Sequence, residues 1–409
     1  MKYYIIAGEA SGDLHGSNLV KELRKLDANA NIRCWGGDLM QAAGATLVRH
    51  YKELAFMGFV EVLINLRTIL KNLSFCKRDI LQFKPDVLVL IDYPGFNLRI
   101  TEWAKQQGIR VVFYISPQVW AWKENRVKKM KQTIDHMMVI LPFEKKYFKN
   151  KWNWDVEYVG HPLVQVIDEF KKKVDSGEMT NDSKKLKGNK VESKNENLAT
   201  HYSPLTTHTP PLSSVNNQLS SKNIIALLPG SRKQEILKKL PIMLEVSKAF
   251  PQSQFVVAKA PGQEDAFYES LLKPYQNVDA VAGKTYYLLA QASAALVTSG
   301  TATLETALFG VPEVVCYKGS NISYQIAKRL IKVKYISLVN LIMDKLVVKE
   351  LIQNDLTVEN ATRELHNLLE DEDRRKQLSQ DYAALKAILS AGGNASAKAA
   401  LSVYSIAVA

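Results

Sequence analysis

Two glycine-containing segments combine residue types that could bind an anion. They are Leu228–Arg232 and Ser299–Glu305, about 70 residues apart, and each follows a short apolar run and opens a helical pattern. Helix N-termini present free N–H groups and the positive end of the helix dipole, so the pair predicts a site for a phosphorylated ligand. Arg232 adds a forked cation suited to a diphosphate, and Glu305 lies one helical turn further, within reach of a ribose diol.

We therefore predict a nucleotide-diphosphate site at these segments. The alternative is that both are ordinary strand-to-helix turns in which glycine permits a tight backbone. The candidate residues are Ser231, Arg232, Ser299, Gly300, Thr301 and Glu305.

A third loop, residues 7–13, joins the first apolar run to the first helical pattern. It lacks the Gly-x-Gly-x-x-Gly spacing of dinucleotide sites, and its Glu9 and Asp13 would repel a phosphate at a helix N-terminus. A neutral hydroxylated group such as a sugar suits this loop better. The alternative is a plain turn in which Asp13 caps the helix.

Asp92 ends another apolar run, Val87–Ile91, at the position where α/β enzymes place catalytic groups. Desolvation there would raise its pKa towards that of a working general base. The alternative is that Asp92 caps the following helix.

Trp120 and Trp122 follow the next apolar run and precede four basic residues between Arg126 and Lys131. They are suited to a sugar, a lipid or RNA, or else they are core tryptophans beside a solvated basic helix. The acidic string Asp371–Asp373 resembles a metal-binding Asp-x-Asp motif, but it lies in a charged helical pattern, so we interpret it as a solvated face. We expect no metal.

The elements that must position these residues alternate along the chain. Apolar runs at 3–7, 87–91, 111–115, 137–140, 224–228, 255–258, 294–297 and 314–317 are separated by helical patterns. Continuous apolar strands of this kind belong to parallel sheets covered on both faces. The sequence predicts two doubly wound Rossmann-like α/β domains facing each other across a cleft, with ligands at the carboxyl ends of the strands.

Composition changes divide the 409-residue chain. We expect an N-terminal Rossmann-like domain at 1–170, a polar and disordered insertion at 171–222, a C-terminal Rossmann-like domain with the nucleotide site at 223–390 and a tail at 391–409. The insertion is rich in Lys, Asn, Ser and Thr and cannot bury enough apolar area to offset its ordering entropy.

Charge and cysteine usage bear on location and partners. The net charge of +13 favours anionic partners, and three widely spaced cysteines fit neither a disulfide framework nor a zinc site. The first apolar run is too short for a signal peptide, and no apolar stretch reaches the roughly 18 residues of a transmembrane helix. We therefore expect a cytoplasmic protein.

The order and spacing of the motifs resemble the lipid-A-disaccharide synthase family, inverting glycosyltransferases of the two-Rossmann-domain (GT-B) class. The matching segments, which cover nearly the whole chain outside the insertion, are residues 7–13, 57–63, 84–87, 91–92, 116–122, 141–144, 160–162, 228–232, 299–305 and 337–340. Two features depart from the family: Gly95 stands where some members have a second aspartate, and the insertion is longer and more polar.

The resemblance implies a reaction. UDP-2,3-diacylglucosamine would donate its sugar to the 6-hydroxyl of 2,3-diacylglucosamine 1-phosphate, giving a β-1,6 disaccharide 1-phosphate and UDP. Asp92 would act as the base and Glu9 would orient the acceptor. Arg232 and the segment after Ser299 would hold the diphosphate, Glu305 would bind the ribose, and Asn340 and Gln353 would also line the site. The family needs no metal or other cofactor, because arginine and helix termini neutralise the leaving group.

An enzyme with acylated substrates must act at a membrane surface. The segment from Phe59 to Leu73 has the pattern of an amphipathic helix. Its apolar residues at helical spacing include Phe59, Val62, Leu63, Leu66, Ile69 and Leu70. We interpret this face as peripheral contact with the inner face of the inner membrane. The alternative is a helix that packs on the sheet.

Two rival functions remain on sequence grounds. A UDP-sugar epimerase of the same fold would carry the same turns without any acceptor, and an RNA-binding protein would explain the charge. The basic residues are spread along the chain with no recognised RNA module, so we expect no nucleic-acid partner.

Overall fold

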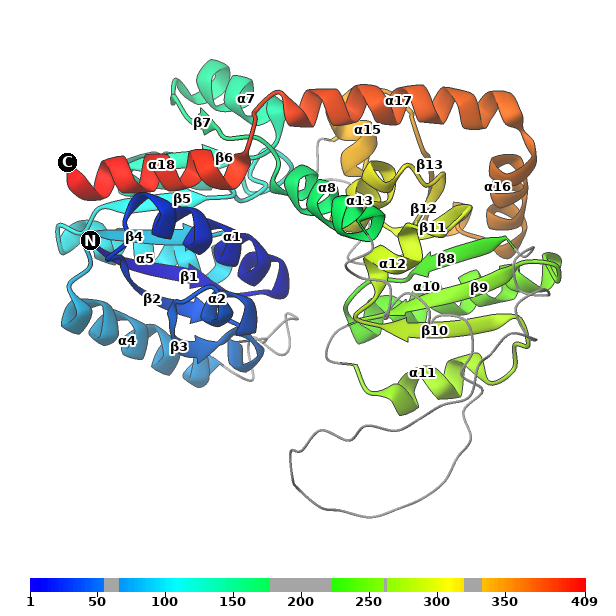
Figure 1. The fold of residues 1–409 in the computed structure, drawn as a ribbon, viewed down its shortest axis with the longest axis horizontal. Coiled ribbons are helices and arrows are strands. Elements are labelled where there is room, and N and C mark those ends of the chain that lie inside the picture. The colour runs from blue at the N-terminus through cyan, green and yellow to red at the C-terminus, as the bar shows by residue number, and fades with distance from the viewer. Residues whose placement is uncertain (55–65, 177–222, 261–262, 320–332) are drawn as a thin grey trace, which may run out of the picture. The chain divides into compact units, whose positions relative to one another are not determined.

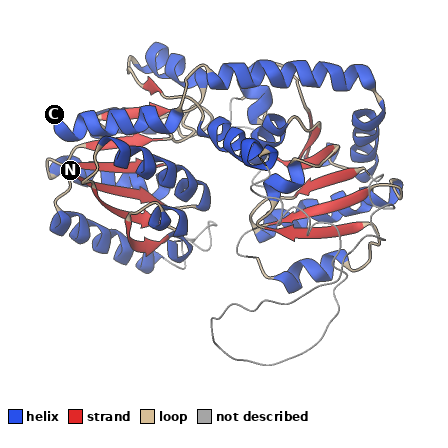
Figure 2. Cartoon of the chain, viewed as in Figure 1, coloured by secondary structure: helices blue, strands red, loops and turns tan. Residues whose placement is uncertain are grey.

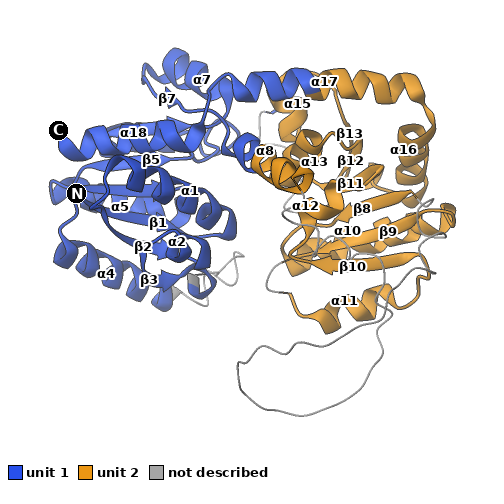
Figure 3. Cartoon of the chain, in the orientation of Figure 1, with its two compact units in different colours: residues 1–166, 322–334, 383–409 blue, residues 167–321, 335–382 orange. Residues whose placement is uncertain are grey.

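The computed structural model describes residues 1–54, 66–176, 223–260, 263–319 and 333–409. The chain divides into two compact units (Figure 3). The first unit contains Met1–Val166, Ile322–Lys334 and Ala383–Ala409, and the second contains Ile167–Asn321 and Tyr335–Tyr382. Most of the expected insertion, Phe59, Val62 and Leu63 lie outside the described residues. Among the described helices, none is long and apolar enough to cross a bilayer.

The first unit is a seven-stranded parallel sheet in the order β3-β2-β1-β4-β5-β6-β7. Its strands are β1 (Lys2–Ala7), β2 (Asn31–Gly36), β3 (Thr46–His50), β4 (Val87–Ile91), β5 (Val111–Tyr114), β6 (His136–Val139) and β7 (Glu157–Tyr158). Its helices are α1 (Ala10–Leu26), α2 (Asp38–Ala42), α4 (Leu66–Phe83), α5 (Pro94–Gln106), α6 (Arg126–Thr133), α7 (Pro142–Trp152) and α18 (Ala395–Val408), with a 3₁₀ turn η1 (Tyr51–Leu54). Helices α8 (Pro162–Asp175) and α17 (Glu372–Ser390) span the unit boundaries in the sequence.

Burial on both faces explains the apolar runs of β1 and β4. Ile5 and Val89 belong to a core shared with α1 and α18, whereas Ile6 and Leu90 belong to a second core shared with α4 and α5 (Figure 1). Successive strand residues point to opposite faces, so a strand covered on both sides has no polar positions.

The second unit is a six-stranded parallel sheet in the order β10-β9-β8-β11-β12-β13. Its strands are β8 (Ile224–Leu228), β9 (Gln254–Lys259), β10 (Val278–Ala282), β11 (Ala294–Thr298), β12 (Glu313–Tyr317) and β13 (Lys349–Ile352). Its helices are α10 (Lys233–Val246), α11 (Asp265–Leu272), α12 (Thr285–Leu289), α13 (Thr301–Phe309), α15 (Leu338–Met343) and α16 (Val358–Glu370), with 3₁₀ turns η3 (Ser247–Ala249) and η4 (Gln353–Asp355). Helices flank the sheet in each unit (Figure 2), which confirms the prediction of two parallel-sheet α/β domains.

The C-terminal segment differs from the expected tail. Residues 383–409 belong to the first unit, where α18 packs against α1. The chain reaches it through a close backbone crossing, because a Cβ at Gly392 would lie 2.3 Å from the Cα of Gly160. Only glycine permits this approach, so the last helix is part of the first domain.

Candidate active site

In the first unit, the two loops with candidate catalytic residues follow neighbouring strands. β1 pairs in parallel with β4, with Ala7 opposite Ile91, so Glu9 and Asp92 follow the carboxyl ends of adjacent strands. The strand order reverses between β1 and β4. In open α/β sheets ligands bind at such a switch point, so the sheet topology brings both predicted residues to the binding edge.

Asp92 lies in a backbone conformation that L-residues rarely adopt. Asp92 and Tyr93 have φ angles of 45° and 48°, in the left-handed region, where each costs about 1 to 3 kcal/mol. The buried Asn97 side chain holds this turn, since its Nδ2 donates to the carbonyls of Ile91 (3.2 Å) and Asp92 (2.8 Å). Tyr93, and not Asp92, is the N-cap residue of α5, so helix capping does not account for the aspartate.

The surroundings of Asp92 favour its protonated form. Burial, with a smaller contribution from the negative charge of Glu9, raises the pKa of its carboxyl to about 7, and a backbone hydrogen bond from Tyr93 acts in the opposite direction. A carboxylate with this pKa is matched to general-base work near neutral pH.

Gly8 and Asp13 shape the loop around Glu9. A Cβ at Gly8 would lie 2.3 Å from the ring of Tyr93, so glycine lets that ring pack on the loop. Glu9 is the N-cap residue of α1, and Asp13 lies buried in its first turn. The Asp13 carboxylate accepts hydrogen bonds from the backbone of Gly37, Leu39 and Met40 (2.8–3.1 Å) at the start of α2. The alternative interpretation, in which Asp13 caps α1, is therefore wrong, since the Asp13 carboxylate binds the start of α2.

A buried glutamate not assigned from the sequence lies near Asp92. Glu144, at the start of α7, accepts hydrogen bonds from the Leu141 backbone (2.9 Å) and from Nε1 of Trp120 (3.2 Å). Burial raises its pKa to about 8, and the charge of Asp92 contributes in the same direction. Glu144 thus ties the tryptophan loop to α7, whereas Trp122 is exposed.

In the second unit, the two glycine-containing turns also meet at a switch point. β8 pairs in parallel with β11, with Leu228 opposite Val297, and the strand order reverses between them. Arg232 is the N-cap residue of α10 and Gly300 is that of α13, with φ of 144°. Two helix N-termini therefore follow neighbouring strand ends, as the predicted anion site requires.

Arg232 belongs to a chain of charges that includes a lysine not identified from the sequence. The Arg232 guanidinium lies 3.4 Å from Glu235, and the other oxygen of Glu235 lies 3.8 Å from Nζ of Lys239. Lys239 is only 3% exposed and also contacts the hydroxyl of Thr298 at the end of β11. Gly230 leaves room for this cluster, because a Cβ there would lie 3.0 Å from Glu235.

The predicted ribose-binding residue has a partner within its own unit. Tyr286 of α12 donates a hydrogen bond of 2.9 Å to Glu305 in α13. Burial raises the pKa of Glu305 to about 7, although this hydrogen bond lowers it. Ser299 donates to the carbonyl of Ile336 (2.7 Å), whereas Ser231 and Thr301 are exposed.

Asn340 and Gln353 differ in their position relative to the carboxyl ends of the strands in the second unit. Asn340 is fully buried: its oxygen accepts from the backbone of Val347 and Val348, and its Nδ2 donates to the Val348 carbonyl and to Glu350. Its amide is saturated, so it supports the fold around Glu350. Gln353, with φ of 54°, follows β13 at the carboxyl edge. Its Nε2 is buried without a hydrogen-bond partner among the described residues.

Part of the predicted membrane face lies on α4. Ile69 packs against the sheet core and Leu73 is buried, whereas Leu70 is 54% exposed. The side chain of Leu66 and residues Phe59, Val62 and Leu63 lie outside what the structure describes. In the described part of this face, Ile69 and Leu73 therefore pack in the core, and Leu70 is exposed.

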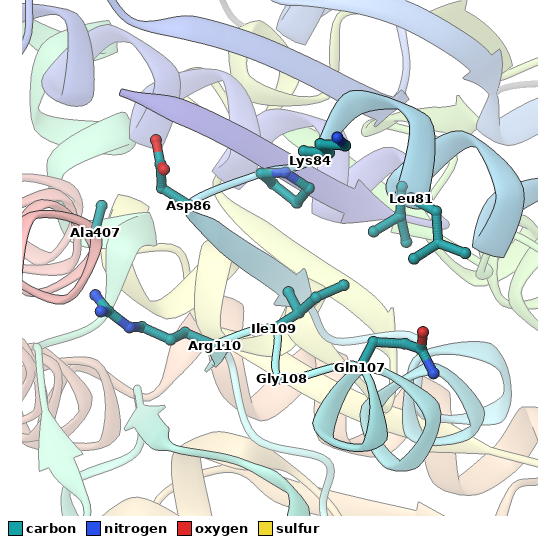
Figure 4. Close-up of a pocket in the computed structure, with 10 residues that line it drawn as sticks. Leu81, Lys84, Asp86, Gln107, Gly108, Ile109, Arg110 and Ala407 are labelled. Atoms are coloured by element: carbon teal, nitrogen blue, oxygen red, sulfur yellow. The ribbon is translucent and has the colours of Figure 1, made fainter.

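A cavity of about 440 Å³ lies in the first unit at the opposite end of the strands (Figure 4). Lys84 and Asp86 precede β4, and Arg110 precedes β5, so this cavity opens at the amino ends of the strands. None of the candidate site residues lines it.

Comparison with known proteins shows the family to which this chain belongs. A family model described as lipid-A-disaccharide synthetase matches residues 3–220 and 194–403. The chain belongs to this family. The lipid-A-disaccharide synthase of Geobacter metallireducens is 36% identical over 394 residues, covering 95% of this chain and 93% of that protein. The enzyme of Syntrophus aciditrophicus is 35% identical, with coverage of 98% and 96%.

Solved structures share the fold at low sequence identity. UDP-GlcNAc 2-epimerase from Neisseria meningitidis, bound to UDP-GlcNAc, aligns with a TM-score of 0.64 at 14% identity, covering 99% of this chain and all of that one. The calicheamicin glycosyltransferase CalG4 aligns with a TM-score of 0.56 at 17% identity, with coverage of 99% and 97%. Epimerases and glycosyltransferases share this architecture, so the family membership, and not the fold, separates the two rival functions.

Proposed function

We propose that this chain is the glycosyltransferase that joins UDP-2,3-diacylglucosamine to 2,3-diacylglucosamine 1-phosphate, releasing UDP and the β-1,6-linked lipid A disaccharide 1-phosphate. The observation that carries the proposal is the family match, which extends through both domains. The positions of Asp92 and Arg232 at the switch points of their sheets support it.

The first domain supplies the acceptor side of the reaction. The Asp92 carboxylate removes the proton of the acceptor 6-hydroxyl while that oxygen attacks C1 of the donor sugar. Its pKa of about 7 keeps it basic enough for the transfer and largely ionised above neutral pH. Glu9 orients the acceptor from the adjacent loop.

The second domain supplies the donor side. As the bond between C1 and the diphosphate breaks, negative charge grows on the leaving oxygens. Arg232 and the first N–H groups of α13 neutralise this charge, and the buried Lys239 adds a second cation at the same strand ends. Glu305 accepts hydrogen bonds from the ribose, and Gln353 presents its Nε2 to the nucleotide.

Incubation with both diacylated substrates tests the proposed function. We expect mass analysis to find the disaccharide 1-phosphate together with stoichiometric UDP. The control omits the acceptor: conversion of the UDP-sugar in its absence would point to an epimerase instead.

We further infer that α4 and the segment before it contact the membrane where the acylated substrates reside. Leu70 is exposed and adjoins the exposed Arg67 and Lys71, the combination that binds an interface with anionic headgroups. Leu70→Ser is expected to reduce sedimentation with anionic liposomes by several-fold while the melting temperature stays within about 2 °C, because no packed side chain is lost.

Leu81→Ser is the matched control, because Leu81 is exposed on the same helix near its other end. Equal liposome binding by the two variants and the unchanged protein would remove α4 from the membrane contact. Ile69→Ser should lower stability instead, because Ile69 packs on the core.

A further inference from the structure

A second cavity of the first unit, about 240 Å³ in volume, lies between α5 and α6. Its lining includes Gly95, Leu98, Arg99, Arg126, Lys129 and Met130. A buried hydrogen bond of 3.0 Å from Thr133 to Thr101 links the two helices at this cavity. Its lining begins at Pro94, two residues after Asp92, in the first turn of α5.

Two of its three cations have no carboxylate partner in the part of the chain that the structure describes. Lys129 forms an ion pair of 2.6 Å with Glu102. Within the described residues, by contrast, no ion pair neutralises the guanidinium of Arg99 or Arg126. The two arginines lie near each other: burial lowers the pKa of Arg126, and the charge of Arg99 lowers it further.

Neighbouring groups add positive potential. Lys123 lies 4.1 Å from the ring centroid of Trp122 and Arg126 lies 6.0 Å from it. Burial lowers the pKa of Lys123, and the charge of Arg126 lowers it further. The N-terminus of α5 also opens here, with no described heavy atom within 4 Å of a Cβ placed at Gly95. Gathering like charges is unfavourable, so their arrangement around a cavity indicates an anionic ligand.

We propose that this α5–α6 cavity is the subsite for the 1-phosphate of the acceptor sugar, with Arg99 and Arg126 as its ligands. A phosphate monoester is a compact dianion whose oxygens match two guanidinium forks. The donor carries only a diphosphate, which the second domain binds. This assignment rests on the proposed function, because it requires one acceptor molecule to place its phosphate in the α5–α6 cavity and its 6-hydroxyl at Asp92.

The subsite explains how an acceptor is selected and oriented. The phosphate bound beside the first turn of α5 holds the sugar ring, and Asp92, at the start of the same loop, faces a hydroxyl of that ring. The charge of Arg99 also reaches the Tyr93 hydroxyl, whose pKa it lowers against the opposing effects of burial and Glu9. A sugar lacking the phosphate would lose this anchor and bind weakly.

The test compares Arg99→Gln/Arg126→Gln with Lys129→Gln in the full-length protein. For an acceptor with short acyl chains, the double variant is expected to raise KM by about 100-fold, with KM for the UDP-sugar unchanged. Lys129→Gln should change the KM for this acceptor by less than about 3-fold, because Lys129 is already paired with Glu102. With a matched acceptor lacking the 1-phosphate, the unchanged protein and the double variant should show the same KM.

Three results would overturn the subsite. One is an unchanged KM for the phosphorylated acceptor. Another is an equal loss with both acceptors, which would indicate a structural effect. The third is weaker binding to phosphatidylglycerol vesicles with normal acceptor kinetics, which would assign the arginines to lipid headgroups.

Failure of the proposed function is recognised separately. If the unchanged protein forms no disaccharide, calorimetric binding of the same short-chain sugar 1-phosphate decides the subsite alone. Loss of that binding in the double variant and its retention in Lys129→Gln supports the subsite. Equal binding by the two variants, or no binding by the unchanged protein, overturns it.

Discussion

Asp92→Asn is expected to lower turnover by about 10² to 10⁴-fold while the protein still binds UDP, because asparagine keeps the shape of the side chain but cannot accept a proton. Asn97 holds the unusual backbone at Asp92, and the side-chain oxygen of asparagine can still accept the backbone hydrogen bond from Tyr93, so the variant should fold. Steady-state kinetics and calorimetric UDP binding measure the two quantities. Near-normal turnover would remove Asp92 from the chemistry.

The pH profile gives an independent signature of the same base. The pKa of Asp92 is raised to about 7 and the reaction needs its ionised form, so kcat/KM should fall about tenfold per pH unit as the pH drops below 7. The charge of Glu9 helps to raise that pKa, so Glu9→Gln should move the fall to lower pH. A profile that does not move in Glu9→Gln would mean that another group titrates.

The local pattern of the sequence predicted the central strands and the turns that follow them. β1, β4, β8 and β11 are buried on both faces and therefore read as continuous apolar runs. Glu9, Asp92, Arg232 and Gly300 follow these strands within four residues, and parallel pairing brings the strand ends together. For these residues, position in the sequence was sufficient to predict position in the fold.

Edge strands and long-range packing were not predictable in the same way. β10 and β13 contain polar residues such as Asp279, Lys349 and Glu350, because each pairs on one side only and is less enclosed. The sequence predicts a tail where α18 lies, because the partner of this helix, α1, is at the other end of the chain. No local signal links two segments so far apart.

The burial of single polar residues was also not predictable from the sequence. Lys239 has the sequence context of a solvated helical lysine, and only its contact with Thr298, on a strand 59 residues away, reveals its position. Asn340 entered the site through family resemblance, yet its hydrogen bonds are all taken by nearby backbone and Glu350. The identity of such residues does not indicate whether a side chain faces ligand or core.

Arg232→Ala should weaken UDP binding and slow turnover together, by about 10² to 10³-fold in turnover, because the guanidinium stabilises charge that grows on the leaving diphosphate. Its contact with Glu235 is long at 3.4 Å and the side chain is 58% exposed, so the loss of that pair costs little stability. Arg232→Lys should restore only part of the rate, since an ammonium cannot form the bidentate contact.

Lys238→Ala is the matched control for Arg232, because Lys238 is an exposed cation on the same helix, one position before Lys239. If general positive charge near α10 attracts UDP, the two alanine variants will lose similar affinity, and the loss will fall steeply with added salt. If Arg232 contacts the diphosphate, its variant alone loses affinity, and the difference persists at high salt because a ligand-covered ion pair is poorly screened. Unchanged UDP affinity in Arg232→Ala, measured by calorimetry, would exclude this arginine from the diphosphate site and leave Lys239 and the N-terminus of α13 to bind the leaving group.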